Sequence, residues 1–256
     1  MNIRTILSIG VLVSTLMVQG VNAAEPTATE SNKIRDVLKQ HFPEFKVDQI
    51  TSSPLKGLYQ VTAGGTVLYM TGDGRYAVSG DIIDLDHGQK DITEDFRKQA
   101  RVKAINAIGE ENMIIFAPKN PKYTVTVFTD VDCGYCRKLQ TDMPKINELG
   151  IAVRYLAFPR SGPNTPTFDK MVKVWCASDK KQALIMANQD KAAEGKACDS
   201  NPIMNELQLG MSLGVSGTPT LIFADGTMIP GYVPPDKMLK VAQQLANPNA
   251  PAKTAQ

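Results

Sequence analysis

Histidine, tryptophan and cysteine are scarce in this chain, which has two His, one Trp and four Cys among 256 residues. Both histidines, His41 and His87, precede all four cysteines. A hydrolase with a Cys–His pair is therefore disfavoured, because the thiols have no histidine in their part of the chain. A zinc site is disfavoured as well, because a pair of thiols would need two further ligands at close spacing.

Neither sign of charge is in excess, and long apolar runs are missing from most of the chain. Lys and Arg number 28, against 26 Asp and Glu. This balance gives no electrostatic reason to expect a nucleic acid or an anionic membrane as a partner. Beyond the N-terminus no stretch is apolar enough to span a bilayer. The remaining length suffices for two small domains or one large domain.

Residues 1–24 have the features of a secretory signal peptide. Arg4 precedes an apolar run at 6–18, and small residues follow at 21–24. These features predict cleavage near Ala23 or Ala24. An uncleaved membrane anchor is the alternative, but the run is shorter than a membrane span and a polar segment follows it. We therefore expect export, and the short charged segment favours the bacterial periplasm.

The most informative motif is Cys133-Gly134-Tyr135-Cys136. Alternation at 123–128 predicts a strand that leads into the motif, and a helix pattern continues after it. Cys133 should lie at the helix N-terminus, where free N–H groups and the helix dipole favour a thiolate. Gly134 and Tyr135 form the active-site loop between the two sulfurs. We interpret the motif as a redox dithiol; a zinc half-site and a purely structural short disulfide are the alternatives.

The other two cysteines are Cys176 and Cys198. Disulfides persist in exported proteins, and four cysteines allow three pairings. Sequence proximity pairs Cys133 with Cys136 and Cys176 with Cys198. We interpret the second pair as structural, because closing its loop would stabilise the fold by about 3 kcal/mol. A second redox pair is the alternative.

Residues 25–88 predict a small α+β unit. Residues 31–40 place apolar side chains at helical spacing, and four short alternating runs follow at 57–61, 66–70, 75–79 and 81–85. Glycine-containing turns at 64–65 and 73–74 indicate hairpins. A unit of this size buries little apolar surface, so we expect it to be a dimerisation domain. Docking on the rest of its own chain is the alternative.

The rest of the chain predicts a linker helix at 89–112 and an α/β domain at 113–246. The linker is polar with a thin apolar stripe, which is typical of a spacer. Pro144 should kink or end the helix that follows the dithiol. The tail at 247–256 is rich in Pro and Ala and is expected to be disordered. The other predicted elements are strands at 113–116, 123–128, 151–158 and 218–223, a helical insertion at 163–212 that holds Cys176 and Cys198, and a helix at 236–245.

Thr218-Pro219 opens a predicted hairpin. Proline donates no ladder hydrogen bond, so it leaves the strand edge open, and an X–Pro bond can be cis at small cost. A cis bond would present the backbone of Thr218 to an incoming peptide. An ordinary strand-capping proline is the alternative, but the strand–dithiol–helix unit upstream favours substrate binding.

A strand, a dithiol at a helix start and a Thr-Pro before a hairpin together resemble the thioredoxin fold. Four strings, in the same order, resemble the DsbC family of bacterial periplasmic disulfide isomerases: residues 128–136, 153–160, 213–219 and 230–235. The resemblance covers essentially the whole mature chain. It implies a V-shaped homodimer, in which the N-terminal units join two catalytic domains around a cleft that holds misfolded exported proteins.

The resemblance also implies a role for each residue of the site. Cys133 would be the attacking thiol and Cys136 the resolving thiol. Pro219 would be cis, with Thr218 beside the sulfurs. The Cys176–Cys198 bond would be structural. No metal or organic cofactor is required, and a membrane partner of the DsbD type would reduce the dithiol.

Three positions depart from the pattern of thioredoxin-like proteins or complicate it. Such proteins often carry a buried acid six positions before the first cysteine, where this chain has Val127. The proton acceptor for the second cysteine must therefore lie elsewhere. Asp130 and Asp132 would oppose ionisation of the first cysteine. Arg154 on the neighbouring strand is a candidate to compensate them, and a surface ion pair is its alternative role.

The sequence thus predicts a periplasmic thiol–disulfide oxidoreductase that acts as a protein disulfide isomerase. Two enzymatic alternatives share the chemistry: a net oxidase, and a DsbG-like reductase of sulfenic acids. A holdase chaperone that binds unfolded chains without thiol chemistry is the alternative from another class.

Overall fold

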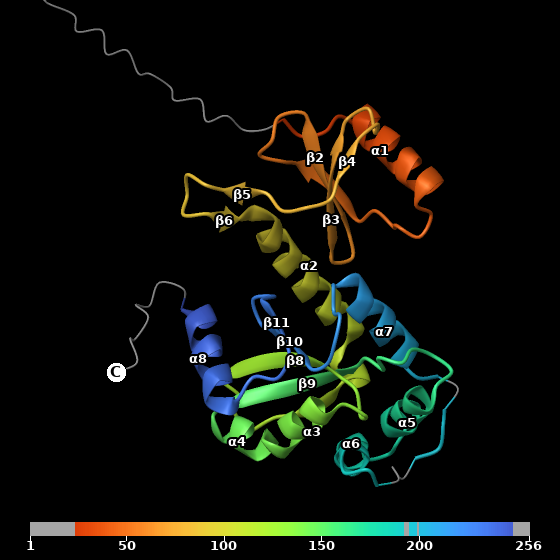
Figure 1. Ribbon diagram of the computed structural model, residues 1–256, viewed down its shortest axis with the longest axis vertical. Coiled ribbons are helices and arrows are strands. Elements are labelled where there is room, and N and C mark those ends of the chain that lie inside the picture. Colours follow the sequence, from red (N-terminus) through yellow and green to blue (C-terminus); the bar gives the residue numbers. More distant parts are fainter. Residues whose placement is uncertain (1–23, 192–194, 199, 248–256) are drawn as a thin grey trace, which may run out of the picture.

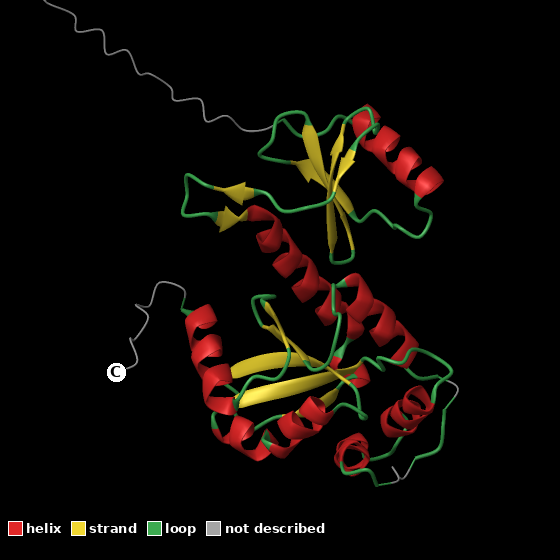
Figure 2. Ribbon diagram, viewed as in Figure 1, coloured by secondary structure: helices red, strands yellow, loops and turns green. Residues whose placement is uncertain are grey.

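The computed structural model describes residues 24–191, 195–198 and 200–247. The predicted signal peptide at 1–24 and the predicted tail at 247–256 lie almost entirely outside the described residues. The described chain forms a small N-terminal unit, a helix that leads away from it, and a larger α/β domain (Figures 1 and 2). Within these residues, no helix is both long and apolar enough to cross a membrane.

The N-terminal unit packs one helix against an antiparallel sheet in the order β1-β2-β3-β4 (Figure 1). Ile34 and Leu38 lie one helical turn apart and bury the same face of α1 against Val61 and Met70 of the sheet. The sequence patterns missed β1, which is polar. The bounds are α1 Ala28–His41, β1 Gln49–Ser52, β2 Leu58–Ala63, β3 Thr66–Thr71 and β4 Ala77–Val78.

Helix α2 (Ile92–Ile108) follows a two-stranded ribbon of β5 (Ile83–Asp84) and β6 (Lys90–Asp91). Its second half differs from the spacer that its polarity predicts. Ile105 is buried in one cluster with Phe128 of the larger sheet. The helix therefore contributes to the core of the α/β domain.

The α/β domain is built on a five-stranded sheet in the order β11-β10-β8-β9-β7. The central strands β8 and β9 are parallel, and the remaining neighbours are antiparallel. A parallel pair needs a crossover, which here is the helical segment after the dithiol. The bounds are β7 Ile114–Phe116, β8 Tyr123–Thr129, β9 Ile151–Ala157, β10 Thr220–Phe223 and β11 Met228–Pro230.

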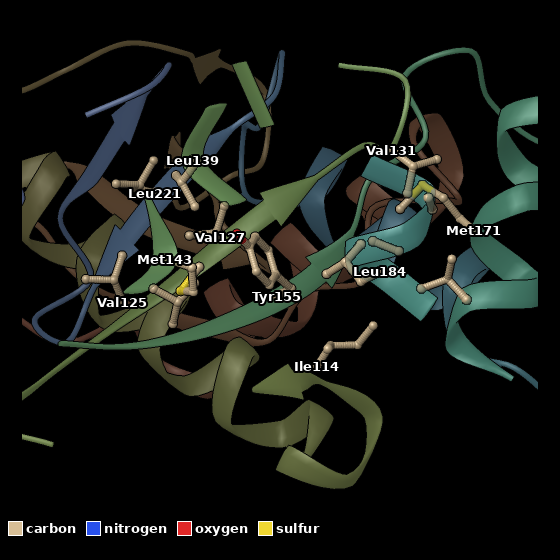
Figure 3. Close-up of a cluster of buried hydrophobic side chains, with 14 of the residues drawn as sticks. Ile114, Val125, Val127, Val131, Leu139, Met143, Tyr155, Met171, Leu184 and Leu221 are labelled. Atoms are coloured by element: carbon tan, nitrogen blue, oxygen red, sulfur yellow. The ribbon is translucent and has the colours of Figure 1, made fainter. Parts of the chain in front are cut away.

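Helices cover both faces of this sheet (Figure 1). Alternate residues of β8 and β9 divide between two apolar clusters, because successive side chains of a strand point to opposite faces. Val127 and Tyr155 belong to the larger cluster, with Leu139 of α3 and Met143 of α4 (Figure 3). Phe128 belongs to the smaller cluster, which α2 and α7 cover.

The crossover helix breaks where proline predicts it to break. Helix α3 ends at Thr141 and α4 begins at Met143, with Pro144 in its first turn. The predicted insertion at 163–212 contains three helices. The bounds are a short 3-10 helix η1 Glu110–Asn112, then α3 Gly134–Thr141, α4 Met143–Glu148, α5 Pro166–Trp175, α6 Lys180–Asn188, α7 Ile203–Ser212 and α8 Pro235–Ala246.

The turn between β2 and β3 lies against the end of α7. A Cβ atom built on Gly65 would lie 2.7 Å from the Cα atom of Leu213 and 2.8 Å from the carbonyl oxygen of Ser212. Only glycine allows two backbones to approach so closely. The N-terminal unit therefore contacts the α/β domain of its own chain at this point, in addition to its connection through α2.

Candidate active site

Cys133 and Cys136 lie at the junction between β8 and α3. Cys133 is the N-cap residue of α3, and its own backbone N–H donates to the carbonyl of Asp130 across the turn that leaves the strand. Both thiols are free. Cys133 is 4% exposed and Cys136 1% exposed. Cys133 is thus less open to solvent than we expect of an attacking thiol, whereas Tyr135 beside it is 67% exposed.

The environment strongly favours the thiolate of Cys133. A hydrogen bond from the Cys136 thiol is the main cause, and smaller contributions come from Thr218 and from the N–H groups of Cys136 and Tyr135. Burial opposes them, and together they lower the pKa of Cys133 from 9.0 to about 5. These N–H groups belong to the first turn of α3, where the helix has no internal acceptor for them. Cys133 is therefore largely ionised at neutral pH.

The environment of Cys136 favours the protonated thiol instead. Burial raises the pKa of Cys136 above its ordinary value, and the hydrogen bond that it shares with Cys133 raises it further. One buried proton is thus shared unequally: Cys133 carries the charge and Cys136 keeps the hydrogen. This division suits a nucleophile paired with a second thiol that reacts later.

Asp130 is buried in the turn that leads to Cys133, and its carboxylate is paired with Arg160. Arg160, just after β9, donates to the Asp130 carboxylate from its side-chain Nε at 2.9 Å and from its backbone N–H at 3.0 Å. The negative charges of Asp130, Cys133 and Cys136 all raise the pKa of Arg160, with the Asp130 hydrogen bond as the largest cause. Arg160 therefore compensates this carboxylate and also favours the thiolates.

Of the two roles considered for Arg154, the structure shows the ion pair and not compensation of Asp130 or Asp132. Arg154 donates to the Thr126 hydroxyl at 3.1 Å and lies 3.6 Å from the Glu110 carboxylate. The second acidic residue, Asp132, is held by Lys170 at 2.8 Å. Sequence reasoning missed Arg160, whose contact with Asp130 spans 30 positions of the chain.

Thr218 and Pro219 lie beside the dithiol. The Thr218–Pro219 peptide bond is cis. The Cys133 thiol, when protonated, donates to the Thr218 carbonyl oxygen at 3.2 Å. The Pro219 carbonyl accepts from the N–H of Gly231 at 2.7 Å, which ties this segment to the turn after β11. The structure thus brings together the two halves of the site that the sequence places about 85 residues apart.

An aromatic pair flanks the loop between the sulfurs. The rings of Tyr135 and Tyr232 stack with centroids 6.3 Å apart. The Tyr232 hydroxyl donates to Asp142, and the Lys138 ammonium lies 5.5 Å from the centre of the Tyr232 ring. These contacts anchor Tyr232, so one face of the exposed Tyr135 has a fixed support. Sequence reasoning assigned no role to Tyr232.

The remaining cysteines, Cys176 and Cys198, form a disulfide with their Cα atoms 5.7 Å apart. Cys176 follows α5, and both residues lie in the helical insertion. They are therefore separate from the dithiol. In the part of the chain that the structure describes, no three His, Cys, Asp or Glu side chains come together as a possible metal site.

A buried carboxyl group supports the same region from the other side of the sheet. The N–H of Ala157, the last residue of β9, donates to Glu206 of α7. Burial raises the pKa of Glu206 to about 8, although the hydrogen bond from Ala157 acts against it. Glu206 is therefore mostly protonated at neutral pH.

The described geometry joins a free dithiol at a helix start to a cis Thr-Pro segment at the start of the adjacent strand, within a five-stranded sheet. This combination defines a thiol–disulfide oxidoreductase of the thioredoxin fold, which confirms the predicted fold class. Residues 110–246 match the family described as thioredoxin-like domain, and residues 21–94 match the disulfide bond isomerase protein N-terminal domain.

Curated relatives are similar over most of the chain. The thiol:disulfide interchange protein DsbC of Escherichia coli (strain K12) is 38% identical over 76% of this chain and 80% of its own length. DsbC of Dickeya dadantii is 33% identical over 88% of this chain and 90% of its own length. A solved structure, the disulfide interchange protein from Neisseria gonorrhoeae, is 28% identical with a TM-score of 0.47, over 53% of this chain and 98% of that one.

This chain belongs to the DsbC family of thiol:disulfide interchange proteins. It is accordingly a thiol–disulfide oxidoreductase of the disulfide isomerase class.

Proposed function

We propose that this protein reshuffles incorrect disulfides of exported proteins in the periplasm, with Cys133 as the attacking thiol and Cys136 as the resolving thiol. The observation that carries the proposal is the unequal ionisation of the pair. The pKa of Cys133 is lowered to about 5, with the hydrogen bond from Cys136 as the main cause. A thiolate is the form that attacks disulfides.

The reaction starts from the reduced dithiol. The Cys133 thiolate attacks one sulfur of a client disulfide, a mixed disulfide forms, and the other client sulfur leaves as a thiolate. That thiolate can attack a different disulfide of the client, which releases another client thiolate. This second thiolate attacks the mixed disulfide, forms a new client disulfide and frees Cys133 without net oxidation. Alternatively, Cys136 attacks Cys133, which frees the client thiol and leaves the enzyme oxidised.

Thr218 and Pro219, beside the dithiol, bind the backbone of the client. Thr218 and Pro219 lie next to the Cys133 sulfur, and the carbonyl oxygen of Thr218 is 3.2 Å from it. A peptide in extended conformation can use such an edge position for backbone hydrogen bonds. Gly134 and Tyr135 form the exposed rim of the same loop. The Cys176–Cys198 disulfide has a structural role in this scheme.

The active form is a homodimer joined through the N-terminal units. Tyr76 and Val78 are exposed apolar side chains at or next to the edge strand β4, and Leu85 is a third exposed one nearby. Exposed apolar residues on a short edge strand suit pairing with a second copy. A membrane reductant of the DsbD type keeps the dithiol reduced, and a signal peptidase cuts near Ala23 or Ala24.

Reactivation of scrambled ribonuclease tests the proposal, together with a native mass measurement. We expect Cys133→Ala to abolish reactivation, and Cys136→Ala to accumulate mixed disulfides with the client, because Cys136 can no longer release them. Both variants keep the Cys176–Cys198 bond and serve as matched controls for folding. Full reactivation by a folded Cys133→Ala protein would refute the mechanism.

The alternatives give different results in the same set of experiments. A net oxidase would be recovered from cells with Cys133 and Cys136 oxidised. A sulfenic-acid reductase would be trapped on clients with one oxidised cysteine. A holdase would protect a cysteine-free client equally well after both cysteines of the dithiol are replaced by alanine. The matches to interchange proteins do not favour these alternatives.

A further inference from the structure

The resolving step requires Cys136 to lose a proton in a closed environment. Once Cys133 is bound to a client sulfur, it carries no charge and no longer accepts the Cys136 hydrogen bond. Cys136 is 1% exposed, so its thiolate forms with almost no access to water. The position six residues before Cys133 holds Val127, which is apolar and buried. A polar group that assists this ionisation must therefore come from another strand.

Tyr155 is the residue that stands next to this apolar position. In the parallel pair of β8 and β9, Val127 and Tyr155 are register partners, so their side chains point to the same face of the sheet. Both belong to one apolar cluster with Leu139 of α3, which lies one turn after Cys136. Figure 3 shows the Tyr155 ring beside Val127 and within the same layer.

The hydroxyl of Tyr155 has no partner within the described structure. Tyr155 is 1% exposed, so water outside the protein does not satisfy the hydroxyl either. An unpaired buried hydroxyl costs about 1–3 kcal/mol, and proteins rarely retain one without a function. The Tyr155 hydroxyl also interacts electrostatically with the dithiol. Burial raises the pKa of Tyr155 well above 10.0, and the negative charge of Cys136 raises it further.

We propose that the Tyr155 hydroxyl stabilises the Cys136 thiolate that forms during resolution of the mixed disulfide. This inference rests on the proposed resolving role of Cys136. The hydroxyl keeps its own hydrogen and turns its dipole toward the developing charge. The Cys133–Cys136 bond forms, and the bond from Cys133 to the client breaks. The departing client sulfur takes up the proton that Cys136 has lost, so the client leaves as a thiol.

Other groups near Cys136 act in different ways. The Thr129 hydroxyl at the end of β8 and a backbone contact at Asp130 lower the pKa of Cys136, whereas burial and Cys133 raise it. The Arg160 guanidinium acts on both thiolates from the loop after β9. Arg160 is paired with Asp130, however. Among the described residues, the hydroxyls of Tyr155 and Thr218 are both unpaired, and Tyr155 is the one that lies in the apolar layer under α3. Tyr155 thus acts through Cys136, by stabilising its thiolate, and does not itself contact the client.

Titration of Cys136 in a Cys133→Ala protein isolates the effect, because it requires no isomerase activity. Alkylation by iodoacetamide as a function of pH reports the ionisation. We expect Tyr155→Phe to make Cys136 about tenfold less reactive at a fixed pH, the lower end of what a hydrogen bond to a charge contributes. Tyr123→Phe, at the opposite end of β8, is the matched control and should leave the titration unchanged.

A single-turnover measurement on the protein with both thiols completes the test. Tyr155→Phe should slow release of a preformed mixed disulfide by about the same factor and leave the rate of the first attack by Cys133 unchanged. Replacing Tyr155 by 2,3-difluorotyrosine, which keeps the shape and strengthens the donor, should shift Cys136 in the opposite direction, even if the phenylalanine variant folds poorly. Unchanged titration of Cys136 with either substitution would overturn the inference without affecting the proposed function.

Discussion

Replacing Cys136 by alanine should raise the pKa of Cys133. The hydrogen bond from Cys136 is the largest cause of the low value of about 5. A hydrogen bond to a charged group contributes about 1.5–3 kcal/mol, which corresponds to about 1–2 pKa units. The pKa of Cys133 should therefore rise to about 6–7. Cys136→Ser, which keeps a donor of similar size, should give a smaller rise.

The thiolate absorbance near 240 nm, followed as a function of pH, measures this change. The folded pKa of Cys133 lies below the unfolded value, so ionisation stabilises the reduced protein above pH 9, and this stabilisation is lost as the pH falls through about 5. In Cys136→Ala this stabilisation should be lost at a higher pH, because the pKa of Cys133 is higher in that variant. An unchanged titration of Cys133 in both variants would refute the assignment of its low pKa to Cys136.

Two further predictions concern stability. Replacing both Cys176 and Cys198 by alanine should lower the free energy of unfolding in urea by about 3 kcal/mol, because the closed loop is lost; reactivation of scrambled ribonuclease per folded molecule should not change, and a clear decrease would indicate a second redox pair. Glu206→Gln should be nearly neutral at pH 4.5 and should stabilise the protein at pH 8 by up to roughly 5 kcal/mol, because the raised pKa of about 8 makes the native carboxyl costly as the pH rises. Equal stability of variant and parent in urea at pH 8 would contradict the burial argument.

Local patterns predicted the elements that carry the site. The alternation before Cys133 gives β8, the helix pattern after it gives α3, and Pro144 separates α3 from α4. These features depend on neighbours in the sequence, which is why a single chain reveals them. The strands that were missed or shortened, such as β1 and β4, depend on pairing with other strands rather than on their own side chains.

Long-range partners could not be predicted from the sequence. The choice between Arg154 and Arg160 depends on where the chain leaves β9: Arg154 lies within the strand, whereas Arg160 turns back over Asp130. The stacking of Tyr232 on Tyr135 joins residues almost a hundred positions apart. The protonated state of Glu206 depends on complete burial, which a lone glutamate in a helix does not reveal.

The tight backbone approach of Gly65 to Leu213 has a mechanical consequence. Five residues separate Leu213 from Pro219, and this short segment leads from the end of α7 to the Thr218 carbonyl beside the Cys133 sulfur. A tilt of the N-terminal unit would displace the start of that segment, because the two backbones are in contact there. The Thr218–Pro219 bond would then shift relative to Cys133, a few residues further along the chain.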